Sequence, residues 1–193
     1  MSAGGKIIGV LGIGEVPDTV LKVVAAHVTG YLKLRTDVLP PLALPADAHN
    51  PMRGQYDAAK ILAGLETVSF RGHEKIIGIL STDLFVPIFT HVFGEARQGG
   101  TVALISIFRL GNPLGFGPAS HVVLERAAKV ALHELGHLFN QIHCEDTRCL
   151  MHFSGSLEEL DRSPFDFCRY CAASFRLRLR RYFQGGGHAA PGP

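Results

Sequence analysis

Hydrophobic positions along the chain follow two different spacings. Short apolar runs typical of buried strands occur at 6–11, 76–80 and 101–108. Apolar residues at helical spacing predict helices over 17–33, 55–66 and 120–139. Because the predicted strands and helices follow one another along the chain, the pattern indicates an α/β fold.

This regular pattern is interrupted in several places. The stretch Val38–Leu44 contains Pro40 and Pro41, so it is predicted to be an edge strand or an extended loop. Residues 81–100 are irregular and rich in aromatics, and residues 111–119 form a loop of glycine and proline. We expect that either irregular segment could cover a functional site.

The pattern changes again after residue 143. Residues 144–171 hold all four cysteines, and a last helix is predicted to begin at Ser163-Pro164. Its apolar stripe would comprise Tyr170, Phe175, Leu179 and Phe183, and its arginines are Arg176, Arg178, Arg180 and Arg181. We expect the arginines to form a solvated face, with a nucleic-acid patch as the alternative. The predicted organisation is one domain over 1–184, divided into a sheet-and-helix part (1–143) and a cysteine-bearing lobe (144–184), with a flexible tail at 185–193.

Composition and charge narrow the class of protein. The chain has 193 residues, a formal net charge of +2 and a mean hydropathy of +0.19. Its most apolar stretch, 102–108, is far shorter than the roughly 18 residues that a membrane-spanning helix needs. The small net charge gives no reason to expect nucleic acid or a membrane as a partner. The N-terminus has no secretory pattern, so we expect a cytoplasmic protein with reduced cysteines.

The string His133-Glu134-Leu135-Gly136-His137 lies within the predicted helix at 120–139. Two histidines four residues apart share one helix face, so both imidazoles can reach one cation. The glutamate between them can then lie beside the metal as a general base without binding it.

His143 extends this pattern to HExxHxxNxxH. In a straight helix, His143 would lie about 9 Å along the axis from His137 and be rotated by roughly 240°, so it could not share the same site. The chain must therefore turn, and Asn140 is suited to the left-handed conformation that ends a helix. Three histidine ligands leave the fourth zinc position open for water, as in catalytic sites.

The four cysteines form a second candidate metal site. Cys144 and Cys149 are spaced C-x4-C, and Cys168 and Cys171 form CxxC. Two close pairs are typical of a four-cysteine zinc site, with two disulfides or four unrelated buried thiols as alternatives. Met151, eight residues after His143, would by itself be unremarkable core filler.

Together these features resemble the metzincin clan of zinc peptidases, whose pattern is HExxHxxGxxH followed by a methionine turn. They are more similar still to the archaemetzincin family, which places a cysteine directly after the third histidine, then C-x-M, then CxxC. The matching residues here are His143-Cys144, Cys149-Leu150-Met151 and Cys168-Arg169-Tyr170-Cys171. The segments STDLFVP (81–87) and FGEA (93–96) and the pair Arg109-Leu110 also look like this family. Asn140 replaces the family's usual glycine.

The resemblance implies a single metzincin-like domain with a small mixed sheet, an active-site helix and a zinc-stapled C-terminal lobe. It implies a zinc-dependent metallopeptidase that hydrolyses peptide or protein substrates with a zinc-bound water activated by Glu134. Two zinc ions are implied, one catalytic and one structural. The implied ligands are His133, His137 and His143 for the catalytic zinc and Cys144, Cys149, Cys168 and Cys171 for the structural zinc, with Met151 as the floor beneath the catalytic metal. Phe153 stands where some metzincins carry a tyrosine, so no oxyanion stabiliser besides zinc is identified.

The remaining candidates have less specific signals. We expect 101–108 to be either a sheet-edge strand that lines the cleft and pairs with a peptide, or an ordinary core strand. Asp83 and Glu95 are predicted to make structural hydrogen bonds, and Arg109 is a candidate for the cleft rim. Among the other histidines, His27 is predicted in the core, and His49 and His188 are predicted in solvent. His152 is next to Met151 in the sequence, and a position behind the metal ligands is only the less favoured alternative for it. The alternative functions are a binding module that keeps both metals without proteolysis and a zinc-ribbon nucleic-acid binder.

Overall fold

The computed structural model describes residues 7–111 and 117–184. Its main sheet has five strands in the order β2-β1-β5-β8-β7, of which the first four are parallel and β7 is antiparallel to β8. The strands are β1 (Ile7–Ile13), β2 (Arg35–Val38), β5 (His73–Leu80), β8 (Val102–Ser106) and β7 (Gly94–Ala96). A second, three-stranded sheet comprises β3 (His49–Asn50), β4 (Gln55–Asp57) and β6 (Leu84–Phe85), preceded by the 3-10 turn η1 (Ala46–Ala48). The predicted α/β fold is therefore confirmed, and the sheet is small and mixed.

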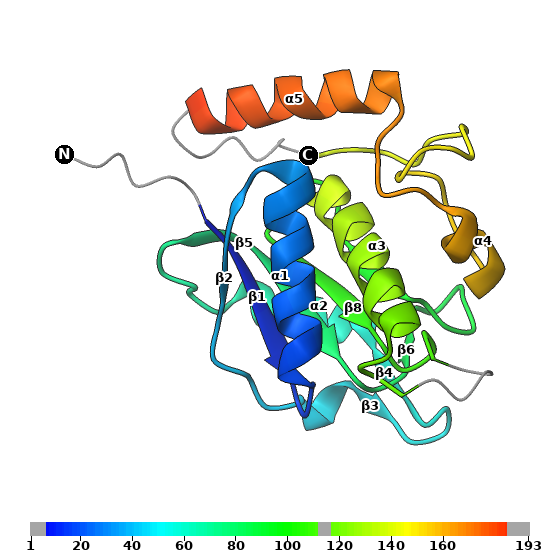
Figure 1. The fold of residues 1–193 in the computed structure, drawn as a ribbon. Coiled ribbons are helices and arrows are strands. Elements are labelled where there is room, and N and C mark those ends of the chain that lie inside the picture. Colours follow the sequence, from blue (N-terminus) through cyan, green and yellow to red (C-terminus); the bar gives the residue numbers. More distant parts are fainter. Residues whose placement is uncertain (1–6, 112–116, 185–193) are drawn as a thin grey trace.

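The helices cover both faces of the main sheet (Figure 1). They are α1 (Asp18–Leu32), α2 (Ala58–Glu66), α3 (His121–Leu138), α4 (Leu157–Arg162) and α5 (Arg169–Gln184). Helices α1 and α3 pack side by side on one face, and α2 lies on the other. The N-termini of α2 and α3 are capped by Asp57 and Ser120, whose side chains accept hydrogen bonds from backbone amides of the first turn.

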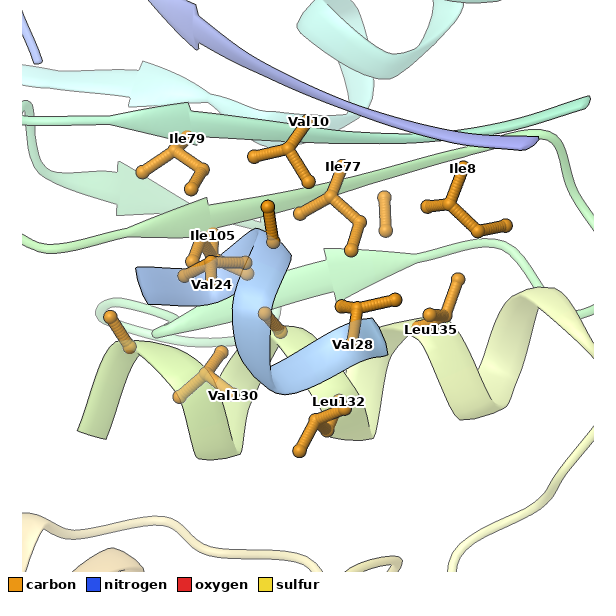
Figure 2. Packing of buried hydrophobic residues seen from close by; sticks show 14 of the residues in the cluster. Ile8, Val10, Val24, Val28, Ile77, Ile79, Ile105, Val130, Leu132 and Leu135 are labelled. Atoms are coloured by element: carbon orange, nitrogen blue, oxygen red, sulfur yellow. The ribbon is translucent and has the colours of Figure 1, made fainter. Parts of the chain in front are cut away.

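Alternating side chains of the strands build two hydrophobic cores. Ile8 and Val10 of β1 point toward α1 and α3, whereas Leu11 and Ile13 belong to the cluster on the α2 side. Figure 2 shows the first core, in which strand residues meet the buried faces of both helices. The residues labelled there are Ile8, Val10, Val24, Val28, Ile77, Ile79, Ile105, Val130, Leu132 and Leu135. This packing fixes α3, the helix that carries the HExxH string, against the sheet.

Several predicted boundaries are wrong. Residues 55–57 form β4, so the helix predicted over 55–66 begins at Ala58, where Asp57 provides the cap. The last helix begins at Arg169 rather than at Ser163-Pro164, and the short helix α4 was not predicted at all. Tyr170 is exposed rather than part of the apolar stripe, while Phe175 is buried as expected. The described arginines of α5 are exposed, as predicted for a solvated face. The predicted tail at 185–193 lies outside the described residues.

The strand at 101–108 is not at the edge of the sheet. Its regular part, β8, pairs with β5 on one side and with β7 on the other, and all of its residues are buried. The edge is β7, which was not predicted because three residues with a polar centre carry no strand pattern. Strand β2 lies at the other edge of the sheet. The proline-containing stretch that follows it from Val38 continues beside β1 as extended chain. There the backbone amides of Leu39 and Leu42 donate hydrogen bonds to the carbonyls of Val10 and Gly12.

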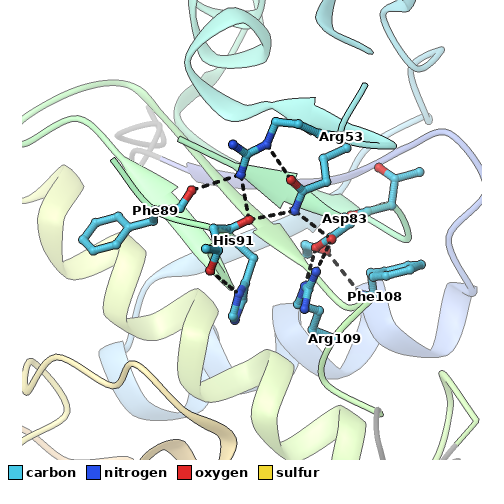
Figure 3. A network of polar contacts seen from close by, with 10 residues as sticks. Arg53, Asp83, Phe89, His91, Phe108 and Arg109 are labelled. Atoms are coloured by element: carbon cyan, nitrogen blue, oxygen red, sulfur yellow. Dashed lines mark hydrogen bonds and ion pairs between the residues drawn. The ribbon is translucent and has the colours of Figure 1, made fainter. Parts of the chain in front are cut away.

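A polar network holds the irregular segment after β5 (Figure 3). Arg109 donates two hydrogen bonds to the Asp83 carboxylate, at 2.7 and 2.6 Å, and Gln55 donates a third at 2.8 Å. Burial raises the pKa of Asp83, but the hydrogen bonds from Arg109 and Gln55 outweigh it and leave the pKa below its usual value. The structural role predicted for Asp83 is therefore confirmed. Arg109 pairs with Asp83 and is not among the described residues that line the metal cleft.

Candidate metal centre

The three histidines of the extended HExxH pattern converge at the C-terminal end of α3. Nε2 of His137 lies 3.1 Å from Nε2 of His133 and 3.2 Å from Nε2 of His143. A tetrahedral zinc ion with Zn–N bonds of 2.0–2.1 Å would hold its ligand atoms about 3.4 Å apart. The three nitrogens therefore fit a single zinc ion.

The third ligand reaches the site because the chain reverses at Asn140, as the sequence predicted. Asn140 has φ 64°, in the left-handed region. The amides of Asn140 and Gln141 donate to the carbonyls of His137 and Gly136, at 2.9 Å each, in the pattern of a Schellman helix ending. Gly99, in the turn between β7 and β8, braces this ending by donating to His137 O at 2.9 Å.

The outer nitrogens of two ligands are fixed by the backbone. Nδ1 of His133 donates to Leu150 O, and Nδ1 of His137 donates to Gln141 O, both at 2.8 Å. These bonds select the tautomer in which Nε2 is free to bind a metal. Burial, together with the neighbouring imidazoles, lowers the pKa of His133 to about 3, and burial also lowers the pKa values of His137 and His143. The lowered pKa values favour the neutral rings at physiological pH, which is the form that can bind a metal ion.

Glu134 lies between the histidines and faces the edge strand. Its side chain is buried, and burial raises its pKa well above the usual value, with a smaller contribution from Glu95. A Cβ atom on Gly94 of β7 would lie 2.6 Å from Glu134 Oε1, so only glycine fits at this position. Gly94 is thus a site residue that the sequence pattern did not reveal, because its contact with α3 is long-range.

Met151 is fully buried directly beneath the HExxH helix. A Cβ atom on Gly136 would lie 2.5 Å from Met151 Sδ, so the glycine of the string permits the close approach of the methionine. The preceding residue, Leu150, supplies the carbonyl that holds His133. The segment around Met151 therefore supports the ligand-bearing turn of α3.

The four cysteines form a second cluster beside the histidines. Their sulfur atoms all lie within 4.8 Å of one another, and none is in a disulfide. Cys144 Sγ and Cys168 Sγ are 3.9 Å apart, which matches the roughly 3.8 Å expected of two thiolates on one tetrahedral zinc with Zn–S bonds of about 2.3 Å. The arrangement favours a zinc site over two disulfides or four unrelated thiols.

The remaining predicted residues lie around these clusters or away from them. His152 donates to Cys144 O at 2.9 Å, between the two clusters, and His27 is half-buried and bonded to Val23 O at 2.8 Å. His49 is exposed as expected, and His188 lies outside the described residues. Glu95 is half-buried in β7, where burial raises its pKa. No hydrogen bond of Glu95 is seen among the described residues, so its predicted structural role stays a prediction.

A cleft of about 560 Å³ opens over the histidines. Strand β7 forms one wall, and residues 153–155, which follow Met151, form part of the other. Phe89 and Phe153 stack across the rim with ring centroids 6.3 Å apart, and Ile142 is 67% exposed beside them. The irregular segment 81–100 thus contributes to the cleft, as predicted, while residues 112–116 of the second loop lie outside the described residues.

Comparison with known proteins identifies the family. The model of peptidase family M54 matches residues 16–177. The chain belongs to peptidase family M54. It is 36% identical to an archaemetzincin of Methanocaldococcus jannaschii over 167 residues, which is 86% of this chain and 90% of that protein. It is 37% identical to an archaemetzincin of Methanopyrus kandleri, over 80% of this chain and 85% of that protein.

Solved structures of this family have the same fold. The crystal structure of the Methanopyrus kandleri archaemetzincin matches with a TM-score of 0.82 at 33% identity, covering 93% of this chain and 98% of that one. The archaemetzincin of Archaeoglobus fulgidus, solved in complex with malonate, matches with a TM-score of 0.76 at 30% identity, covering 87% and 99%. This member of family M54 is therefore a zinc metallopeptidase, with a histidine triad and a cysteine cluster that each can hold zinc. The alternative of a metal-binding module without proteolysis is wrong.

Proposed function

We propose that His133, His137 and His143 hold the catalytic zinc ion of a peptidase that cleaves peptide or protein substrates. The observation that carries this proposal is the convergence of three Nε2 atoms, two of them oriented by backbone carbonyls, beside a buried glutamate in an open cleft. Zinc held there would supply Lewis acidity toward water and toward the peptide carbonyl. Met151, packed under Gly136, would keep the ligand-bearing turn in place.

Glu134 is assigned the role of general base and then general acid. Its carboxylate lies on the cleft side of α3, against the edge strand, and it is not one of the converging ligands. From this position it can accept a proton from the attacking water and return the proton to the leaving amine. The close fit against Gly94 limits the rotamers of the carboxylate, which keeps it aimed at the reacting atoms.

The substrate is proposed to bind as an extended strand along β7, in place of the predicted 101–108. Phe93 O accepts from Ser106 N at 2.8 Å, so the backbone of Phe93 faces β8. Because the direction alternates along an antiparallel strand, the amides and carbonyls of Gly94 and Ala96 face the free edge. A peptide paired with that edge would pass directly beside Glu134.

The cysteine cluster is assigned to a structural zinc. A closed set of four thiolates has no open position for substrate, and its residues tie the segment after His143 to the start of α5. We propose that residues 144–184 form a zinc-stapled lobe of the domain, following the sheet-and-helix part at 1–143.

We further propose that the protein works in the cytoplasm without a membrane or nucleic-acid partner. Four cysteines that are free thiols are typical of a reducing compartment. In the part of the chain that the structure describes, no helix is long and apolar enough to cross a membrane. The net charge of +2 supplies little attraction for a polyanion.

Two variants and a zinc count test these assignments. Glu134→Gln should retain two zinc ions per chain and lose at least about 100-fold in cleavage of an internally quenched peptide library. Cys168→Ser should instead lose one zinc ion and several kcal/mol of folding free energy. Loss of zinc from the glutamate variant, or an unchanged melting curve of the cysteine variant, would contradict the respective assignment.

A further inference from the structure

Large apolar side chains gather at the mouth of the metal cleft and stay open to solvent. Phe89, Ile142 and Phe153 all line the cleft, and they are 45%, 67% and 50% exposed. The rings of Phe89 and Phe153 stack with centroids 6.3 Å apart, and the Phe153 ring meets the His143 ring edge-on at 5.4 Å. Single exposed apolar residues are ordinary, but a group of three beside a metal ligand indicates a binding surface. We call Phe89, Ile142 and Phe153 the apolar rim.

The backbone that carries Phe89 is held by the polar network after β5. Arg53 Nη2 donates to the carbonyls of Phe89 and Thr90, at 3.2 and 2.9 Å, and Gln55 Nε2 donates to Thr90 O at 2.9 Å. The Phe89 amide donates to Val86 O at 3.0 Å. In Figure 3 the Phe89 ring points away from Arg53. The ring is therefore exposed because a well-bonded backbone holds it in that position.

Ile142 and Phe153 are carried by the turns that build the metal centre. Ile142 lies between the ligand His143 and Gln141, whose carbonyl accepts a hydrogen bond from a ligand ring at 2.8 Å. Phe153 lies two residues after Met151, which is fully buried. The apolar rim is thus fixed to the same backbone as the histidines. Little conformational entropy would be lost in ordering it when a substrate binds.

The charges of the cleft indicate which side chains it can accept. Apart from Glu134, the carboxylate and ammonium groups among the described lining residues belong to Glu95 and Lys129. Lys129 is 4% exposed and pairs with Glu125 at 2.8 Å. Glu95 lies opposite Leu104 of β8, whose side chain packs in the core on the α2 side, so the Glu95 side chain points away from α3. A charged substrate side chain at the rim would therefore lose water without gaining a partner, whereas an apolar one gains by burial.

We propose that the apolar rim binds a large apolar side chain, aromatic or branched aliphatic, on one of the two residues that flank the scissile bond. The Cα atoms on either side of a peptide bond are about 3.8 Å apart, and Phe153 contacts His143 directly. A side chain on a residue flanking the reacting carbonyl is therefore within reach of the rim. This specificity rests on the proposed function, because it requires the histidines to hold the zinc at which the peptide reacts.

Binding to an inactive protein tests the rim apart from catalysis. The probes are capped alanine hexapeptides whose third residue is phenylalanine, leucine, alanine, glutamate or lysine, titrated into zinc-loaded Glu134→Gln. The phenylalanine and leucine peptides should bind about tenfold more tightly than the alanine peptide, and the glutamate and lysine peptides no more tightly than alanine. Adding Phe89→Ala and Phe153→Ala should reduce the tenfold preference to less than about twofold.

The matched control is Phe108→Ala, because Phe108 has the same 50% exposure as Phe153 and does not line the metal cleft. It should keep the full preference for the phenylalanine peptide. Zinc content, measured for every variant, should be unchanged. If the Phe153 change lowers the zinc content, Phe89→Ala combined with Ile142→Ala repeats the test.

Cleavage separates this specificity from the peptidase function itself. Wild-type protein should cleave the phenylalanine and leucine peptides next to the apolar residue. The rim proposal is overturned if the five peptides bind within about twofold of one another, if the glutamate or lysine peptide binds most tightly, or if none binds at about 10 mM. Cleavage of all five peptides at equal rates would overturn the rim alone and leave the peptidase function intact. Selective binding without cleavage would support the rim and contradict the proposed function.

Discussion

Replacing Gly136 by alanine tests whether Met151 supports the catalytic turn. The new Cβ would lie 2.5 Å from Met151 Sδ and 3.2 Å from its Cε, more than 1 Å inside normal contact for the sulfur. Met151 is fully buried, so it cannot move aside into solvent. Overpacking of this kind costs about 1–3 kcal/mol. Alanine gains about 0.5–1 kcal/mol over glycine inside a helix, which offsets part of that cost.

Gly64→Ala provides the matched control, because Gly64 also lies in a helix and has no atom within 4 Å of its would-be Cβ. It should stabilise the protein by the propensity gain alone, so the difference between the two variants isolates the overpacking. Urea unfolding of both proteins should give a difference of about 1–3 kcal/mol. Displacement of Met151 also moves the neighbouring Leu150 carbonyl away from His133, so Gly136→Ala should weaken zinc binding at the histidines and leave the cysteine site filled.

A double-mutant cycle refines the same test. Met151→Ala alone should destabilise by about 2–5 kcal/mol because it leaves a cavity. In the Gly136→Ala protein, Met151→Ala should lower the free energy of unfolding by less, because removing the methionine side chain also relieves the overpacking. If Gly136→Ala were as stable as Gly64→Ala, or if the two changes were additive, the methionine would not brace the helix as the structure indicates.

Three further outcomes follow from the same contacts. Gly94→Ala places a methyl group 2.6 Å from Glu134 Oε1. Because the carboxylate must then move, peptide cleavage should fall about 100-fold while the protein keeps two zinc ions per chain. Wild-type activity of this variant would refute the contact. Asn140 has φ 64°, a left-handed conformation that glycine adopts freely and alanine does not. In thermal unfolding, Asn140→Gly should therefore preserve or raise the free energy of unfolding, whereas Asn140→Ala should lower it by about 1 kcal/mol. Equal melting temperatures of the two variants would contradict the left-handed turn. The pKa of Asp83 is lower in the folded than in the unfolded state, so its contribution to stability is present above the unfolded pKa and lost as pH falls through the folded pKa. Asp83→Asn should therefore be less stable at neutral pH and converge on wild type in acid; a pH-independent difference in unfolding free energy would refute this.

The sequence by itself predicted which histidines and cysteines the structure brings together, because the spacing within each motif is local. The periodicity of one helix places His133 and His137 on the same face, and Asn140 ends that helix within one turn. The cysteine spacing likewise identified the second cluster without reference to the sheet. The same reason made several elements predictable, because each has apolar residues at a regular spacing or a clear capping residue. These elements are the strands β1 and β5 and the helices α1 and α3.

Only the tertiary structure decided which strand forms the sheet edge beside the histidines and which glycines are required. Strand β7 is too short and polar to be seen in the sequence, and its place at the edge depends on the order of the whole sheet. The need for glycine at 94 and 136 arises from Glu134 and Met151, side chains that approach from other elements. Arg109, a candidate for the cleft rim, pairs instead with Asp83, which lies far from it along the chain. Hydrogen bonds along one helix are fixed by neighbouring residues, whereas sheet order and close packing are fixed by segments that meet only in the folded chain.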